Sequence, residues 1–271
     1  MFLDAGTGTH SLRWIASIVH RDRLLSGISN ASAPRVTLKS FTAITADETM
    51  RKNVYAQAKE LGVEDKGDVI IGNWKTGVKV DEKGGIEFIS NEKALLEGQK
   101  FDTILADYLV GAIDGFSPYF QDLIFNRLVH HLAPGGRMYV IGLQPIPDEV
   151  SGDANVFCKI TKVRDACILL AEHRCYREYP LDWIERHVQR AGLNVVESKK
   201  YPIRYDHATM LRQINVGRSK LKLFPTKSLA REMGHVLDDL EKESLEVTKR
   251  QPDGRITLGF DYVLVAERPK E

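Results

Sequence analysis

The first residues able to do chemistry lie at the start of the chain, where a short apolar run ends in an acid and two glycines. The run Phe2-Leu3-Asp4-Ala5-Gly6-Thr7-Gly8 leads into a stretch with helical spacing. Glycine permits a sharp strand-to-helix turn and lets a ligand approach the backbone. The free N–H groups of a new helix suit polar or anionic ligand groups. The pattern favours the opening turn of a nucleotide-type α/β domain, and a plain tight turn remains the alternative.

Polar or glycine residues follow four later apolar segments in the same way. They are Thr45-Ala46-Asp47, Gly72-Asn73-Trp74, Asp107-Tyr108 and Gly142. In an open α/β sheet, ligands bind beyond the carboxyl ends of the strands. Any one of these groups could simply end a strand. Together they predict one polar sheet edge, in an order that suits a long nucleotide-like ligand.

Alternating strand and helix patterns would position these residues. Strands are predicted at 41–45, 68–72, 101–106 and 137–142, helices at 10–25, 49–61 and 119–132, a loop at 26–34, and a hairpin or edge excursion at 76–90. This alternation predicts a mostly parallel sheet that is covered on both faces and joined by right-handed crossovers.

The second half of the chain changes character. A turn-rich link at 145–152 precedes predicted helices at 159–175 and 181–191, a strand at 193–197, a helix-prone stretch at 206–249 and a closing strand at 255–266. Pro225 divides the helix-prone stretch into two, because proline cannot continue a helix. The alternation of apolar residues from Ile256 to Leu264 predicts a half-buried strand.

Composition excludes several function classes. The chain has 38 basic and 37 acidic residues, a formal net charge of +1 and a hydrophobic content of 43%, which disfavours a broad nucleic-acid surface despite a small basic patch at 212–222. No apolar run reaches the length of about 20 residues that spans a bilayer, no signal peptide is visible, and the three cysteines form no metal pattern. A cytoplasmic protein without a metal is expected. The first strand begins at Met1, which favours a natural segment preceding it.

Several motifs together carry a family resemblance. They are Leu3-Asp4-Ala5-Gly6-Thr7-Gly8, the helix start at Thr49-Met50, Gly72-Asn73, the strand Phe101 to Asp107, the step Leu132-Ala133-Pro134-Gly135-Gly136-Arg137, and the helix-to-strand unit 181–197. The chain resembles the class I S-adenosylmethionine-dependent methyltransferases of the small-molecule type. The resemblance covers about 1–145 and 180–203 plus the closing strand, and the Pro-Gly-Gly step is its most specific part.

The resemblance implies a Rossmann-like, mixed but mostly parallel seven-stranded sheet, with helices on both faces and a helical insertion before the last strand. We expect a single domain. Its parts would be a cofactor-binding core at 1–145, helical substrate-cap insertions at 146–180 and 204–252, and closing strands at 181–203 and 253–271.

The resemblance also implies roles for individual residues. Asp4, Gly6 and Gly8 would contact the methionine part of S-adenosyl-L-methionine, although His10 stands where the family often has a third glycine. Thr45 or Asp47 would take the place of the usual acid on the ribose hydroxyls. Asn73 would meet the adenine amine, and Trp74 would pack on the adenine or belong to the core.

Asp107 and Tyr108 would lie at the cofactor's reactive edge. Either could act as a base if the methyl acceptor must lose a proton, and either could instead be a plain strand-end cap. A basic cluster around His173-Arg174, Arg204-Tyr205, His207 and Arg212 would suit a carboxylate or phosphate on the acceptor, or form a solvated surface.

The predicted function is therefore methyl transfer from S-adenosyl-L-methionine to a small molecule by direct in-line displacement. One alternative is a non-catalytic methyltransferase-like binding or scaffold protein. Another is a nicotinamide-dependent oxidoreductase, which needs a Gly-x-Gly-x-x-Gly turn and here meets Ser11 at the third glycine position.

Overall fold

The computed structural model describes residues 1–26, 38–82 and 85–270. The chain folds into two compact units: Met1–Gly142, Leu181–Lys199 and Tyr262–Glu271 form the first, and Leu143–Pro180 and Lys200–Asp261 form the second. The two segments predicted as helical insertions lie largely in the second unit. Most of the predicted loop at 26–34 lies outside the described residues. None of the helices in the described ranges is long and apolar enough to cross a membrane.

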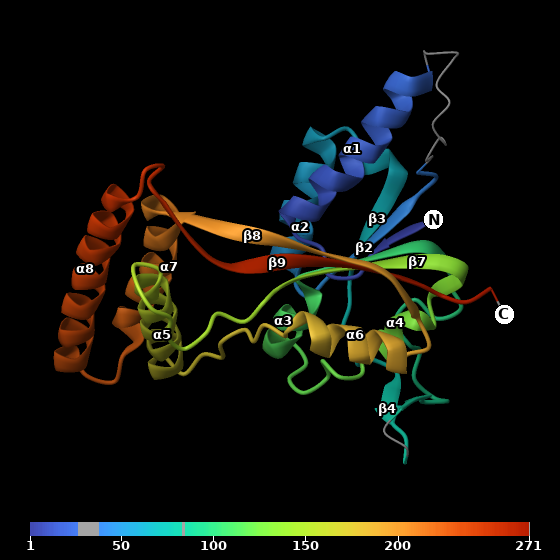
Figure 1. The fold of residues 1–271 in the computed structure, drawn as a ribbon. Coiled ribbons are helices and arrows are strands. Elements are labelled where there is room, and N and C mark those ends of the chain that lie inside the picture. The colour runs from blue at the N-terminus through green and yellow to red at the C-terminus, as the bar shows by residue number, and fades with distance from the viewer. Residues whose placement is uncertain (27–37, 83–84, 271) are drawn as a thin grey trace. The chain divides into compact units, whose positions relative to one another are not determined.

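A single large sheet forms the framework of the first unit (Figure 1). Among the described residues it has seven strands in the order β3-β2-β1-β6-β7-β9-β8. Their bounds are β1 Phe2–Asp4, β2 Phe41–Thr45, β3 Gly67–Ile71, β6 Phe101–Asp107, β7 Leu132–Leu143, β8 Asn194–Asp206 and β9 Arg255–Glu267. Strands β3, β2, β1, β6 and β7 are parallel. Backbone hydrogen bonds join Gly135 to Arg268 and Gln144 to Phe260, so β9 runs antiparallel to β7.

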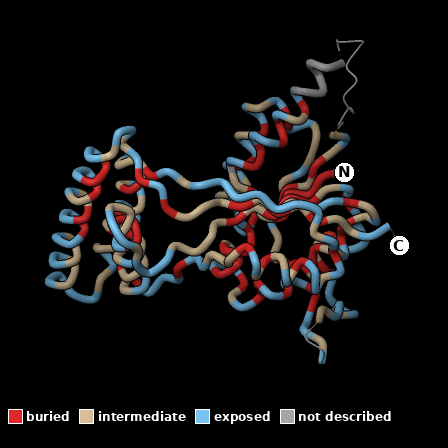
Figure 2. Tube along the Cα trace, in the orientation of Figure 1, coloured by how far each residue is buried: buried red, intermediate tan, exposed pale blue. Residues whose placement is uncertain are grey.

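Helices cover both faces of this sheet, as predicted. Helices α1 (Thr9–Ser26) and α2 (Glu48–Glu60) lie on one face, and α3 (Leu109–Ala112), α4 (Ile124–Val129) and α6 (Leu181–Arg190) lie on the other (Figure 1). Helix α1 buries Leu12, Ile15, Ala16 and Val19, a set at helical spacing. Figure 2 shows the buried residues concentrated along the central strands. Two short 3₁₀ turns, η1 (Glu64–Lys66) and η2 (Ile113–Gly115), complete the connections.

Two sequence predictions between β6 and β7 are wrong. The predicted helix at 119–132 is reduced to α4, because Tyr119 adopts a left-handed backbone with φ of 69° and Leu132 already pairs with Phe101 in the sheet. The Pro134-Gly135-Gly136 step lies inside β7 and not before it. The register shifts there, and Gly135 has a φ of 72°, so the step forms an irregularity in the strand.

The second unit is built around three helices. Helices α5 (Asn155–Leu170), α7 (His207–Lys220) and α8 (Lys227–Arg250) pack together, with η3 (Leu221–Leu223) joining α7 to α8. Their shared core includes Phe157, Cys167, Ile214 and Leu237 and continues to Ile256 at the start of β9. The break between α7 and α8 brackets Pro225, as the sequence predicts.

A buried arginine joins several segments of the first unit. The hairpin strands β4 (Val78–Val80) and β5 (Ile86–Phe88) form a separate two-stranded sheet, as predicted. The guanidinium of Arg127 lies 5.3 Å from the Phe88 ring centroid and 5.5 Å from that of Trp74, and one of its nitrogens donates to Leu95 O at 2.6 Å. The side chain of Arg127 is fully buried, and burial lowers its pKa to about 10. Aromatic faces and a carbonyl therefore stabilise the cation.

His131 completes this cluster. Its Nε2 accepts a hydrogen bond from Arg127, which leaves Nδ1–H to donate to Gln99 O at 3.1 Å. This pattern requires a neutral ring. Burial lowers the pKa of His131 to about 4, and the nearby Arg127 charge acts in the same direction. The cluster is thus built on one buried cation and one buried neutral histidine.

Protonation of His131 should weaken the fold in mild acid. The unfolded chain takes up this proton near pH 6.5 and the folded chain only near pH 4. The free energy of unfolding should therefore fall by about 3 kcal/mol as the pH drops across that interval. His131→Gln keeps an acceptor for Arg127 but cannot be protonated. The free energy of unfolding of this variant should therefore lack the decrease that His131 causes in acid. Urea denaturation of both proteins at several pH values measures the difference, and identical pH dependence would contradict the assignment.

Candidate functional site

The opening turn is held by both neighbours of the central strand β1. Asp4 pairs with Ala43 of β2 and with Leu105 of β6. Beyond the strand, Ala5 N donates to Leu105 O at 2.8 Å and Thr7 N donates to Ile44 O at 2.7 Å. The chain then enters α1 at Thr9. The turn is therefore fixed to the sheet before the helix begins.

Asp4 is the most unusual side chain of this edge. It is fully buried, and neither carboxylate oxygen has a hydrogen-bond partner among the described residues. Burial raises the pKa of Asp4 to about 6. The nearby hydroxyls of Ser11 and Thr7 moderate the rise without reaching hydrogen-bond geometry, and the charge of Asp107 adds to it. A buried carboxylate without a partner costs free energy. It is therefore well suited to a cationic ligand group.

The two glycines of the turn differ in their surroundings. A Cβ atom on Gly6 would lie 2.7 Å from Leu109 Cδ1, so the packing of α3 already explains this glycine. A Cβ atom on Gly8 would meet nothing within 4 Å. The space beside Gly8 is therefore open to a ligand that approaches the backbone.

Trp74 supports the turn from within the protein. Its indole Nε1–H donates to Ala5 O at 2.7 Å, and only 5% of the residue is exposed. The other partners of the ring are Arg127 and His131. These contacts favour the core role that the sequence left open over packing on an adenine.

Asn73 joins the end of β3 to a loop of the same unit. Its Oδ1 accepts from Lys75 N at 2.9 Å and from Ser117 Oγ at 2.6 Å, and its Nδ2 donates to Phe116 O at 3.3 Å. Asn73 therefore positions the loop before α4. Sequence reasoning missed Ser117 as its partner, because the two residues are 44 positions apart and no local pattern links them.

The end of β2 is occupied by local structure. Thr45 is 5% exposed, and its carbonyl accepts from Gly72 N at 2.9 Å. Asp47 is exposed and caps α2, with its Oδ1 accepting from Met50 N at 2.8 Å. A ribose contact from either residue stays a prediction.

Asp107 and Tyr108 end β6 at the same sheet edge. Asp107 pairs with Ile141 of β7 and influences the pKa of Asp4. Tyr108 has a left-handed φ of 49°, its N–H donates to Ile141 O at 3.0 Å, and 39% of the residue is exposed. A bulky residue in this conformation is strained, and such strain concentrates at functional sites.

The predicted basic cluster does not converge on one point. Arg204 pairs with Asp253, His207 Nδ1 lies 3.0 Å from Ser244 Oγ, and Arg212 donates to Thr209 Oγ1 at 2.9 Å. Arg174 and Tyr205 instead line a cavity of the second unit. These contacts favour the solvated surface that the sequence left open over a single anion site, because an ion pair and local hydrogen bonds use Arg204, His207 and Arg212.

Other charged groups are also accounted for locally. Arg218 of the basic patch pairs with Asp238 and Glu241. His130 Nδ1 lies 2.6 Å from Asn126 O, as expected for a histidine at a helix end. The described part of the chain contains no group of three or more His, Cys, Asp or Glu residues able to hold a metal ion.

Solved structures with the same arrangement identify the fold. A proposed methyltransferase from Bacillus halodurans C-125 aligns with 96% of this chain and 98% of its own, at 15% identity and a TM-score of 0.51. The YcgJ protein of Bacillus subtilis aligns with 100% of this chain and 92% of its own, at 15% identity and a TM-score of 0.50. The chain has a Rossmann-like methyltransferase fold. No protein-family model and no curated protein matches the sequence.

The polar residues predicted from the sequence lie along one edge of the sheet in this fold. On this fold, Asp4 and Asp107 lie at the carboxyl ends of the parallel strands β1 and β6, and Gly8 and Asn73 follow the ends of β1 and β3 within four residues. Such an edge is where ligands of open α/β sheets bind. The fit of a ligand here depends on Asp4 and on the open space beside Gly8.

Without a ligand, Asp4 should destabilise the fold at neutral pH. Its pKa is raised from 3.8 in the unfolded chain to about 6, so the free energy of unfolding should decrease as the pH rises through this interval. Asp4→Asn should therefore raise that free energy at pH 7.5 by about 1–3 kcal/mol. Denaturant unfolding measures the gain, with the exposed Asp122→Asn as a control that leaves stability unchanged. A loss of stability in Asp4→Asn would show that the carboxylate has a partner.

Proposed function

We propose that the chain transfers a methyl group from S-adenosyl-L-methionine to a small-molecule acceptor by direct in-line displacement. One observation carries the proposal: the carboxylate of Asp4 is buried without a partner at the glycine turn. A carboxylate in this state suits the ammonium group of the cofactor's methionine part. The methyltransferase fold supports the same interpretation.

Binding and orientation would be the main contributions of the chain. When bound, S-adenosyl-L-methionine supplies a methyl group already activated by its sulfonium. Asp4 would hold the ammonium group, Gly8 would allow close backbone approach, and Asn73 would fix the edge of the site through its hydrogen bonds to the loop at Phe116 and Ser117. Because the leaving group needs no further activation, correct positioning supplies much of the rate.

Asp107 and Tyr108 are the proposed catalytic residues. A base is needed only if the acceptor carries a proton that must be lost. The phenol of Tyr108 is partly exposed at the end of β6, and its strained backbone directs the chain into α3. Asp107 precedes it directly, so the two side chains offer alternative proton acceptors.

A non-catalytic binding protein is the second candidate. The observation favouring it is that Thr45 is buried and Asp47 caps a helix, so neither shows the free acid expected for the ribose hydroxyls. The two candidates differ in a single property: only an enzyme moves the methyl group to an acceptor.

Cofactor binding should require Asp4 and the open space at Gly8. We expect S-adenosylhomocysteine, which keeps the ammonium group, to bind the wild type saturably in calorimetric titrations at pH 7.5. Asp4→Asn should weaken binding by about tenfold or more through the lost ion pair. Gly8→Val should block binding while the melting temperature stays the same, since its Cβ atom meets no neighbour.

Asp122→Asn serves as the charge-matched control for this titration and should bind like the wild type. Absence of saturable binding to the wild type would overturn the proposed function. Wild-type affinity in both Asp4→Asn and Gly8→Val would show that the ligand binds elsewhere.

Catalysis should depend on the end of β6. Incubation with methyl-labelled S-adenosyl-L-methionine and a cell metabolite extract should label a small molecule. If a base is used, Tyr108→Phe or Asp107→Asn should lower the rate by about 100-fold, and the more damaging change identifies the base. Tyr108→Phe should keep the affinity for S-adenosylhomocysteine. Saturable binding without any labelled product would favour the non-catalytic candidate.

A further inference from the structure

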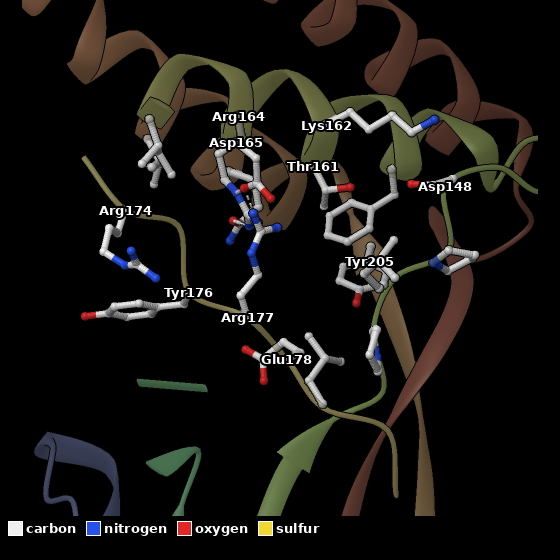
Figure 3. A pocket seen from close by; sticks show the side chains of 18 of the residues that line it. Asp148, Thr161, Lys162, Arg164, Asp165, Arg174, Tyr176, Arg177, Glu178 and Tyr205 are labelled. Atoms are coloured by element: carbon white, nitrogen blue, oxygen red, sulfur yellow. Dashed lines mark hydrogen bonds and ion pairs between the residues drawn. The ribbon is translucent and has the colours of Figure 1, made fainter. Parts of the chain in front are cut away.

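The second unit contains a cavity of about 760 Å³ (Figure 3). Its wall comes from the link that follows β7, from α5, from the segment before α6, from β8 and from α7. All of its lining residues belong to the second unit. A volume of this size is typical of small-molecule sites.

Positive charge exceeds negative charge around the cavity. Five basic residues line it, namely Lys162, Arg164, Arg174, Arg177 and Lys220, against the three acids Asp148, Asp165 and Glu178. Arg164 is neutralised by Asp165, with its Nε 2.8 Å from Oδ1, and it also donates to Gln213 Oε1 at 2.6 Å. Arg177 forms no ion pair among the described residues. Figure 3 shows its side chain extending from the backbone toward Arg164 and Asp165. Arg177 is therefore the cation best placed for an anionic ligand group.

Glu178 cancels only part of this positive charge at neutral pH. Burial raises the pKa of its carboxyl to about 7, with Arg164 opposing the rise and Asp261 adding to it. A substantial fraction of Glu178 is thus protonated near neutrality and can donate a hydrogen bond.

Part of the remaining wall is aromatic and apolar. The rings of Phe157 and Tyr205 are stacked, with centroids 3.8 Å apart and an angle of 24° between their planes. Both rings line the cavity, together with Pro145, Ile146 and Val216. Such a surface favours a planar ring over a flexible chain.

We propose that this cavity binds a planar aromatic molecule that carries one carboxylate, with Arg177 on the carboxylate and the ring against Phe157 and Tyr205. A monoanion fits better than a phosphate dianion, because Asp148 and Asp165 also line the wall. The proposal goes beyond methyl transfer and does not depend on it.

The test uses 2-naphthoate and its neutral counterpart 2-naphthamide, titrated into the full chain at pH 7 and followed by calorimetry. Wild type should bind 2-naphthoate saturably and about tenfold more tightly than 2-naphthamide. Arg177→Gln should reduce the affinity for 2-naphthoate about tenfold and leave that for 2-naphthamide unchanged. Arg231→Gln removes the same charge from an exposed position on α8 outside the cavity and should bind like the wild type.

A second variant tests the cavity itself. Val216 is 38% exposed and lines the wall, so Val216→Trp should fill the space and weaken both probes without a large change in melting temperature. The proposal is overturned if 2-naphthoate does not bind, if both probes bind equally to the wild type, or if Arg177→Gln and Val216→Trp leave its affinity unchanged.

Discussion

The carboxylate of Asp4 lies buried at the carboxyl end of β1, an inner strand of the sheet, with no hydrogen-bond partner among the described residues. A protein interior solvates a charge poorly, so this side chain raises the free energy of the ligand-free fold at neutral pH. The rest of the first unit must supply enough stability to hold it there. Part of this stability comes from the residues that pair with Asp4 on the two neighbouring strands. These are Ala43 and Leu105, which are apolar and fully or almost fully buried.

A series of contacts connects the turn to the core of the first unit. The carbonyl of Ala5, next to Asp4, accepts the indole N–H of Trp74, and the ring of Trp74 lies against the guanidinium of Arg127. Arg127 in turn contacts His131 and Leu95 O. The polar edge is therefore rigid where it meets the core and open at Gly8. Rigid support with one open position is what preorganised ligand binding requires.

Periodicity predicted most of the fold, and it failed where the decisive contacts are non-local. The strands Phe41–Thr45 and Arg255–Glu267 and the break at Pro225 follow from local patterns of apolar residues and from proline chemistry. The predicted helix at 119–132 failed because the pairing of Leu132 with Phe101 prevails over helix propensity.

The same limit applies to side-chain roles. Types and spacing located the edge that contains Asp4, Asn73 and Asp107. They could not show that Trp74 bonds Ala5 O, because those residues are distant in sequence. Nor could they separate Arg174, which lines the cavity, from Arg204, which pairs with Asp253. The residues that line the cavity come from segments that precede and follow the helix at 181–190 in the sequence, and no local pattern links these segments.

Proton release on ligand binding tests the central claim most directly. At pH 6 about half of the Asp4 carboxyls are protonated in the free protein, and an arriving ammonium group should displace that proton. Titration of S-adenosylhomocysteine in buffers of different ionisation enthalpy should therefore show release of about half a proton at pH 6 and none from this group at pH 8. Asp4→Asn should lack the release at pH 6. Binding with equal proton exchange in wild type and Asp4→Asn would contradict the account.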